Sequence, residues 1–292
     1  MLAVGAIESW FAAGERIEAG GFRLFTCVLG DEGRPWLTLL HGYPTCSFDW
    51  AGVADALAQE RRLLVLDFLG FGNSEKPADH DYSIHEQADL TEAVWRHHGV
   101  SSTALVVHDY AVSVGQELLA RRADAGLDVE LERIAFLNGG LYPDMHRALL
   151  VQKLLLHPRM GPIVSARTNE RLLSRGLRRV FAAEHRPSDE ELHEHWLGIE
   201  RHGGARIQHR LIRYIEDRRR NEARWTGALE ATDVPRRFVW GMLDPVSGAH
   251  MAERIVARVP PAELHALADV GHYPQLEAPL RTGLLLRRFV AA

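Results

Sequence analysis

Residues 102–119 read STALVVHDYAVSVGQELL, and this stretch decides the fold. Its first part, Ala104 to Val107, is an unbroken apolar run with β-branched residues, which is typical of a strand buried on both faces. The run stops at His108 and Asp109, and the residues from Val112 onward continue as a plausible helix. The stretch therefore predicts a buried strand that turns sharply into a helix at a polar residue.

Asp109 stands at this predicted turn, and we interpret it as a nucleophile. A strand that turns directly into a helix holds one side chain at the top of a parallel sheet, beside a helix N-terminus that favours negative charge. Two alternatives stay open. Residues 111–115, AVSVG, look like a relaxed G-x-S-x-G motif around Ser113, although Ser113 lies one helical turn past the strand. In the other alternative, Asp109 only caps the helix.

Length and composition limit the class of protein. The chain has 292 residues, which suits one α/β unit with an insertion and can bury a large core. Its net charge is −5 and its basic residues look scattered, which argues against a nucleic-acid partner. The two cysteines, Cys27 and Cys46, have no metal-ligand spacing and fit a reducing compartment. We find neither a leader-like segment nor a bilayer-length apolar stretch, so we expect a cytoplasmic monomer or homodimer without a membrane partner.

Strands and helices alternate along most of the chain, which predicts an α/β fold with a mostly parallel, eight-stranded sheet flanked by helices. Alternation stops after Gly140, and residues 142 to about 225 show helical periodicity, with a capping box that opens a helix at Ser188. Strands resume near Arg237. We therefore predict a core domain of residues 1–140 and 229–292 and a helical cap of residues 141–228.

Three polar residues each follow a predicted strand: Asp109, Asp244 and His272. The carboxyl ends of parallel strands form one crevice, so we expect the three side chains to meet there. Asp244 would orient His272, and His272 would act as a base. The structural alternatives are an Asx turn before Pro245 and a hydrogen-bonded loop histidine.

Several motifs carry a family resemblance that covers nearly the whole chain. HGYPTCSFDW, DFLGFGNSEKP, VVHDY, WGMLDPV and VGHYPQLEAP resemble the epoxide hydrolase and haloalkane dehalogenase branch of the α/β-hydrolase superfamily. The order Asp109, Asp244, His272 is the order that this fold uses. HDYAVSVGQELL, NGGLYPDMHRALLVQKLL and SRGLRRVF resemble the mesoderm-specific transcript group, a likeness that runs through the cap.

The resemblance implies a reaction through an ester of Asp109. The carboxylate attacks an sp³ carbon, and water activated by His272 hydrolyses the alkyl-enzyme ester. By position, the backbone N–H groups of Tyr43 and Tyr110 form the oxyanion hole. An epoxide oxygen also needs a proton donor, which epoxide hydrolases supply from cap tyrosines, and Tyr214 matches one of these by its place in the cap.

The sequence indicates the other proton donor of the cap and the substrate-binding residues less clearly. The first donor position falls near 150–160, where this chain has no tyrosine and offers His157. His41, in the HGYP loop, and Tyr142, at the start of the cap, are candidates for substrate binding. GFGNS at residues 70–74 lacks the third glycine and the helix of a dinucleotide site.

We predict an epoxide hydrolase for a small apolar substrate, with no cofactor and no metal. Haloalkane dehalogenases resemble one another in a Trp directly after the nucleophile, where this chain has Tyr110, although Trp196 or Trp225 is a candidate halide ligand. The alternatives are a haloalkane dehalogenase, another C–X bond or ester hydrolase of this fold, and a non-catalytic ligand-binding protein of the same fold.

Overall fold

One eight-stranded sheet forms the centre of the molecule, in the order β1-β2-β4-β3-β5-β6-β7-β8. The computed structural model describes residues 5–291. β2 pairs antiparallel with both β1 and β4, and every later neighbour in the sheet is parallel. The predicted mostly parallel sheet is therefore confirmed. The strands are β1 (Glu15–Ala19), β2 (Phe22–Leu29), β3 (Trp36–Leu40), β4 (Arg62–Leu66), β5 (Ser102–His108), β6 (Glu130–Leu137), β7 (Arg236–Gly241) and β8 (Glu263–Leu267).

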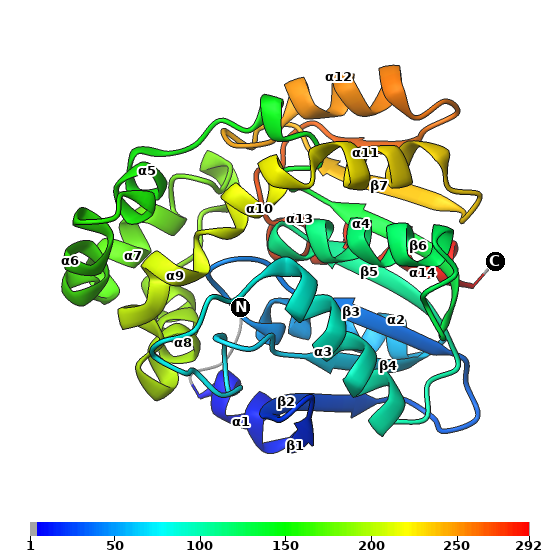
Figure 1. Ribbon diagram of the computed structural model, residues 1–292, viewed down its shortest axis with the longest axis horizontal. Helices are drawn as coiled ribbons and strands as arrows, with labels where there is room; N and C mark the ends of the chain where they lie inside the picture. The colour runs from blue at the N-terminus through cyan, green and yellow to red at the C-terminus, as the bar shows by residue number, and fades with distance from the viewer. Residues whose placement is uncertain (1–4, 292) are drawn as a thin grey trace.

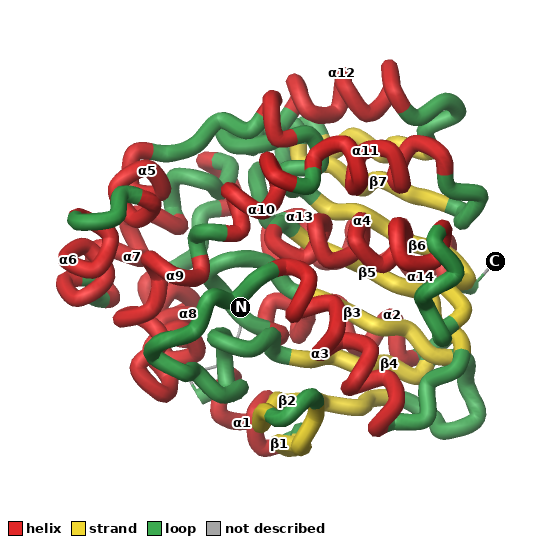
Figure 2. The backbone as a smooth tube through the Cα atoms, in the orientation of Figure 1, coloured by secondary structure: helices red, strands yellow, loops and turns green. Residues whose placement is uncertain are grey.

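Helices cover both faces of this sheet, and a group of shorter helices projects from one end (Figures 1 and 2). The helices of the sheet layers are α2 (Ala51–Ala58), α3 (Ile84–His97), α4 (Tyr110–Ala123), α11 (Glu222–Ala231), α12 (Ala249–Arg258), α13 (Pro274–Glu277) and α14 (Pro279–Val290). The remaining helices are α1 (Ala6–Ala12), α5 (Leu150–Leu156), α6 (Met160–Arg167), α7 (Glu170–Leu177), α8 (Asp189–Glu200), α9 (Gln208–Leu211) and α10 (Tyr214–Arg220). Short 3₁₀ turns cover Ser47–Trp50, Pro143–Met145, Ala183–His185 and Arg201–Ile207.

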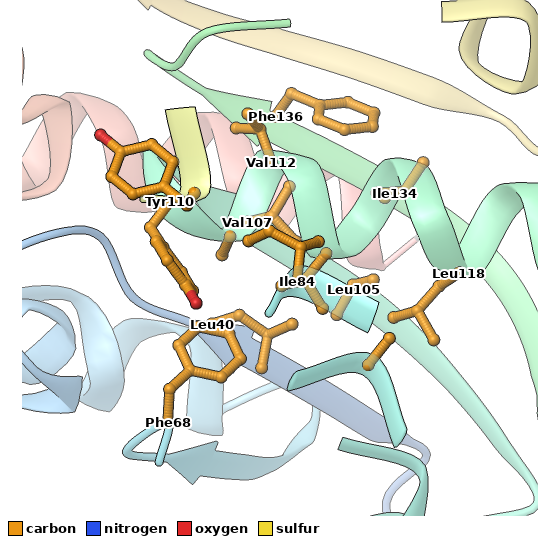
Figure 3. Packing of buried hydrophobic residues seen from close by; sticks show 14 of the residues in the cluster. Leu40, Phe68, Ile84, Leu105, Val107, Tyr110, Val112, Leu118, Ile134 and Phe136 are labelled. Carbon is orange, nitrogen blue, oxygen red and sulfur yellow. The ribbon is translucent and has the colours of Figure 1, made fainter. Parts of the chain in front are cut away.

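Strand β5 is buried on both faces because its side chains alternate between two cores. Leu105 and Val107 belong to the cluster that packs against α3 and α4 (Figure 3). Ala104 and Val106 belong to the cluster on the opposite face, with residues of α2 and α14. An apolar side chain is thus needed at every position, which explains the unbroken run in the sequence.

The predicted β1–β2 hairpin forms at Gly20 and Gly21, which have φ angles of 59° and 86°. Both angles lie in the left-handed region that glycine tolerates best, as two-residue hairpin turns require. The hairpin adds antiparallel strands at one edge of the sheet and leaves its parallel centre free to build a site.

The helical insertion lies between β6 and β7, as predicted. The capping box at Ser188 opens α8: its hydroxyl accepts from the N–H of Glu191, and the Glu191 carboxylate accepts from the N–H of Ser188. Helix α11 behaves differently from the rest of the insertion, since Trp225 and Leu229 pack into the core cluster beside α4. The end of the cap at residue 228 stays a prediction, and α11 crosses that boundary.

Candidate active site

The turn between β5 and α4 holds Asp109 in a strained conformation. Its φ and ψ angles are 46° and −100°, outside the regions that a residue with a Cβ atom normally adopts. Only small residues fit around this turn. A Cβ atom on Gly42 would lie 3.0 Å from the Asp109 Cβ, and one on Gly139 would lie 2.9 Å from the Asp109 carbonyl oxygen. The structure therefore places Asp109, and not Ser113, at the turn.

The three residues predicted from strand ends meet beneath the cap. His272 Nδ1 lies 2.7 Å from Asp244 Oδ2, and His272 Nε2 lies 3.8 Å from Asp109 Oδ1. All three side chains are almost fully buried. The predicted nucleophile, base and orienting acid thus lie in a row, and contacts of this kind are often longer without a substrate than with one.

Asp244 is held by several partners, and its Asx turn is compatible with its contact with His272. Its Oδ1 accepts from the N–H of Val246 at 2.7 Å, which is an Asx turn. Its Oδ2 accepts from Ser247 Oγ at 2.6 Å and from Asn138 Nδ2 at 3.1 Å, in addition to the contact with His272. The turn and the neighbours from β6 keep the carboxylate aimed at the imidazole.

The charges of the site couple the pKa values of its members. Burial alone would raise the pKa of Asp109, but His272 and then Arg218 lower it to about 2. Burial alone would lower the pKa of His272, but Asp244 and Asp109 together raise it to about 10. Burial also opposes ionisation of Asp244, and His272 more than offsets this and holds the pKa of that carboxyl below its usual range. At neutral pH the resting site therefore contains two carboxylates and an imidazolium between them.

Of the two predicted oxyanion-hole donors, one contacts the Asp109 carboxylate. The N–H of Tyr43 donates to Asp109 Oδ2 at 3.1 Å. Tyr110 follows Asp109 directly and is the first residue of α4, so its N–H has no acceptor inside the helix. That the two N–H groups form an oxyanion hole stays a prediction.

A buried arginine that the sequence analysis did not identify ties the cap to this turn. Arg218, on α10, donates from Nη2 to the Asp109 carbonyl oxygen at 2.7 Å and from Nε to Ser113 Oγ at 2.6 Å. Its guanidinium also lies over the ring of Tyr214, 4.5 Å from the centroid. The spacing of Tyr214 and Arg218, four residues apart on one helix, was a signal that they share a face.

A cavity of about 630 Å³ opens above Asp109 and His272. Its floor also includes Tyr43 and Tyr273, and its roof comes from α5, α6 and α7. Most of the roof is aliphatic, which suits an apolar substrate. The apolar side chains of the cavity that come from the cap are Leu149, Val151, Leu155, Met160, Ile163, Val164, Leu172, Leu173, Leu177 and Val180.

The predicted proton donors differ in where the structure places them. Tyr214 is buried, with its ring centroid 5.0 Å from that of Tyr110 and 5.8 Å from that of Tyr43. Burial, with the nearby charge of Asp109, raises its pKa well above the usual value. Tyr43 and Tyr273, which the sequence analysis did not consider as donors, are the tyrosines that line the cavity.

His157 is not brought to the site, which corrects the sequence-based expectation. It lies exposed between α5 and α6, where its Nδ1 accepts from the N–H groups of Arg159 and Met160 at 3.2 and 3.3 Å. His146 is the cap histidine near the charged groups. Both of its ring nitrogens are buried without a hydrogen-bond partner in residues 5–291, and burial lowers its pKa to about 4.

The two predicted substrate-binding residues, His41 and Tyr142, also lie outside the cavity lining. His41 is fully buried and accepts at Nε2 from the N–H of Phe68 at 3.1 Å, so it connects two loops of the core. The Tyr142 hydroxyl donates to Glu230 Oε1, on α11, at 3.1 Å. A position in a loop that follows a strand did not by itself reveal which way its side chain points.

Neither candidate indole is positioned to bind a halide. Trp225 donates its indole N–H to Glu117 Oε2 at 2.8 Å, and Glu117 also pairs with Arg121 and Arg224. Trp196 is half-buried on α8 and does not line the cavity. Within residues 5–291, we also find no group of three or more His, Cys, Asp or Glu side chains placed to hold a metal ion.

Comparisons with known proteins agree with this architecture. A family model described as the alpha/beta hydrolase fold matches residues 35–279. The mesoderm-specific transcript homolog protein of Bos taurus is 39% identical over 284 residues, which cover 94% of this chain and 85% of that protein. The putative hydrolase LipZ of Mycobacterium tuberculosis is 37% identical over 274 residues, which cover 94% of each. A crystal structure of the haloalkane dehalogenase DbeA-M1 loop variant from Bradyrhizobium elkanii superposes with a TM-score of 0.81 at 20% identity, over 95% of this chain and 96% of that one. The likeness to this dehalogenase structure shows a shared fold.

Proposed function

Because this chain belongs to the α/β-hydrolase fold family, we propose that it is a hydrolase that opens epoxides to diols through an ester of Asp109. One observation carries the proposal: a carboxylate, and not a hydroxyl, occupies the strained turn that faces His272. Attack by a carboxylate on an acyl carbon would give a mixed anhydride, whereas attack on an sp³ carbon gives a stable ester. The site therefore suits alkyl transfer better than ordinary ester hydrolysis.

In the first step, Asp109 Oδ1 attacks an epoxide carbon and the C–O bond of the ring breaks. The Tyr43 N–H holds the other oxygen, Oδ2, which fixes the carboxylate in one orientation. The pKa of Asp109, held near 2, keeps the carboxylate ionised at neutral pH. The developing alkoxide then takes a proton from a nearby donor, and the product is a hydroxyalkyl ester of Asp109.

The second step follows from a change in charge. Formation of the ester removes one of the two carboxylate charges that raise the pKa of His272, so this pKa falls and the imidazole can lose its proton. Neutral His272 then accepts a proton from water, and the water attacks the ester carbonyl. The N–H groups of Tyr43 and Tyr110 stabilise the oxyanion. When it collapses, the bond from the ester carbon to the alkyl oxygen breaks, this oxygen takes the proton from the His272 imidazolium, and the diol leaves the Asp109 carboxyl group.

Tyr214 is the proposed proton donor for the epoxide oxygen. Its raised pKa keeps the phenol protonated, and Arg218 beside its ring lowers the cost of forming a tyrosinate. Tyr43 and Tyr273 are the alternatives because they line the cavity directly. A haloalkane substrate would need N–H donors for the halide, and the indole N–H of Trp225 is already bonded to Glu117. This geometry favours an epoxide over a halide.

Intact-protein mass spectrometry of His272→Ala with a panel of epoxides and haloalkanes tests the proposal. Without its base the second step stalls, so we expect a mass gain equal to one whole epoxide that is absent in Asp109→Ala. A gain equal to an alkyl group without its halogen would assign a dehalogenase instead. No adduct with any compound, together with loss of simple ester hydrolysis in Ser113→Ala, would assign the nucleophile to Ser113.

A further inference from the structure

One segment of the cap has a strongly positive net charge. Residues 147–179, which we call the cap face, contain eight basic residues and one acidic residue, Glu170, although the whole chain has a net charge of −5. The scattered pattern inferred from the sequence therefore does not hold for this segment. The eight basic residues are Arg147, Lys153, Arg159, Arg167, Arg171, Arg175, Arg178 and Arg179.

These cations are turned to solvent. All except Arg178 are exposed, and only Arg178 forms a salt bridge, with Asp189, among the contacts of residues 5–291. Glu170, the one acidic residue of the segment, contacts His193 at 2.9 Å. Five arginines line a groove of about 780 Å³ on the outside of α7: Arg171, Arg175, Arg178, Arg179 and Arg186.

The same segment exposes most of the large apolar side chains that the chain shows to solvent. Among residues 5–291, ten large hydrophobic residues are exposed and six of them lie in this segment, which is far more than its share of the sequence. Leu150 on α5 is 73% exposed, and Leu172 on α7 is 51% exposed. The other four are Val151, Leu154, Met160 and Ile163. α5, α6 and α7 form the end of the molecule farthest from the sheet (Figure 1), so this mixed surface protrudes.

The exposed apolar residues also reach the active-site cavity. Val151, Met160 and Ile163 are each at least 40% exposed and each line the cavity above Asp109. Part of the apolar lining of the cavity is therefore also part of the exposed surface of the cap. Exposed apolar groups rimmed by arginine and lysine are typical of proteins that lie on a membrane surface.

We propose that the cap face docks on the surface of an anionic lipid bilayer. The basic residues would contact lipid phosphates, while the apolar side chains enter the boundary between head groups and acyl chains. In residues 5–291 we find no helix with the length and apolar character to cross a bilayer, and peripheral docking requires none. The expectation of no membrane partner rested on that absence alone. A second copy fits poorly because two such faces would bring like charges together.

This location would also define the substrate class, a consequence that rests on the proposed function. A lipophilic epoxide dissolved in the bilayer would enter between α5, α6 and α7 without crossing water. The cavity of about 630 Å³ and its aliphatic roof suit a long alkyl chain. Docking itself is independent of the reaction and can be measured without turnover.

Flotation with lipid vesicles tests the docking directly. The probes are vesicles of phosphatidylcholine alone and vesicles in which about one third of the lipid is phosphatidylglycerol. We expect the protein to float only with the anionic vesicles, and added salt to weaken binding. The triple variant Lys153→Glu, Arg159→Glu, Arg171→Glu should bind about 100-fold more weakly, because each cation near an anionic surface contributes and its reversal repels. These three residues do not line the cavity.

The control is a triple variant with the same change in net charge elsewhere. Arg96, Arg219 and Arg288 are exposed and form no salt bridge in residues 5–291, so Arg96→Glu, Arg219→Glu, Arg288→Glu should bind as wild type does. Leu150→Ser with Leu154→Ser should weaken binding without changing charge, and thermal unfolding confirms that each variant is folded.

Four outcomes would overturn the proposal. These are no flotation with anionic vesicles, equal loss in the two charge-reversal variants, binding of polyglutamate in place of vesicles, and a dimer in sedimentation that the cap-face variant separates. The last two would assign the face to an acidic polypeptide or to a second copy. Vesicle binding without any epoxide adduct in His272→Ala would refute the proposed reaction and leave the docking intact.

Discussion

The floor and the roof of the cavity are held in different ways. On the floor, Asp244 accepts from Val246, Ser247 and Asn138 as well as contacting His272, and the group is almost wholly buried. On the roof, α5, α6 and α7 contribute mainly aliphatic side chains, several of them exposed. In the proposed reaction, this difference would let the floor determine which bond is broken and the roof determine which molecule reaches it.

The largest expected effect is on the floor, at Asp109. We expect Asp109→Asn to lower kcat by about 10⁵-fold or more, because the amide cannot form the ester. Ser113→Ala, one helical turn away, should change kcat by less than about tenfold because it removes only a hydrogen bond to Arg218. Steady-state kinetics on an epoxide substrate measure both, and a larger loss in Ser113→Ala would reverse the assignment.

The next largest effect tests whether Asp244 sets the charge and the orientation of His272. Asp244→Asn should lower kcat on the order of 10³- to 10⁴-fold, because the imidazole loses the group that sets its tautomer. Asp244 is the largest contribution that raises the pKa of His272, so this pKa should fall from about 10 in the variant. NMR titration of the imidazole checks the shift.

The contact of His272 with Asp244 also makes the free energy of unfolding depend on pH. The raised pKa of His272 contributes stability that is fully present below its unfolded value of about 6.5 and is lost as the pH rises through about 10. The difference in unfolding free energy between wild type and Asp244→Asn should therefore narrow from pH 6.5 to pH 10. Urea unfolding across that range measures it, and a constant difference would contradict the assigned ion pair.

A matched pair of leucine substitutions compares the packing of the two regions. Leu105, on β5, is 1% exposed, whereas Leu154, on α5, is 37% exposed. We expect Leu105→Ala to lower the free energy of unfolding by about 3 kcal/mol and Leu154→Ala by less than about 0.5 kcal/mol. Denaturant unfolding tests this, and similar losses would mean that the roof is packed as a second core.

A smaller effect on kcat should show which tyrosine is the proton donor. Tyr214→Phe should lower kcat for an epoxide by about 10²-fold, which corresponds to about 2.7 kcal/mol. Tyr43→Phe and Tyr273→Phe serve as matched controls because both tyrosines line the cavity. The variant with the largest loss of kcat identifies the proton donor. If Tyr214→Phe loses the least, the donor is Tyr43 or Tyr273.

The smallest expected effect is the pH dependence of ester formation in wild type. The pKa of Asp109, lowered to about 2, keeps the carboxylate ionised, so the single-turnover rate should change less than about twofold from pH 8 to pH 5. His272 is the group that lowers the pKa of Asp109 most. In His272→Ala this contribution is gone while burial still raises the pKa, so the single-turnover rate should decrease as the pH is lowered from 8 to 5. Rapid-quench mass spectrometry provides both profiles.

The sequence was most informative where one physical requirement acts on neighbouring residues. The run from Ala104 to Val107 had to be apolar because its side chains alternate between two cores, and this predicted β5. The turn at Asp109 is marked by the end of that run. Asp244 and His272 follow their strands directly, so parallel topology alone brings them together.

The cap was harder to interpret because its side-chain directions depend on packing between short helices. His157 matched an expected region by position, yet it caps a turn at the surface. Arg218 contacts the backbone of the nucleophile and is buried, whereas its neighbours Arg219 and Arg220 are exposed. Its spacing from Tyr214 indicated a shared helix face, but only the packing of the cap shows that this face is the buried one.

The bond from Arg218 to the Asp109 carbonyl has a consequence for biosynthesis. Asp109 leaves the ribosome first, then Arg218, Asp244 and finally His272. The strained turn therefore lacks its guanidinium until the cap has been made, and the imidazole arrives after both carboxylates. A nascent chain cannot carry out the proposed reaction before His272 has been translated.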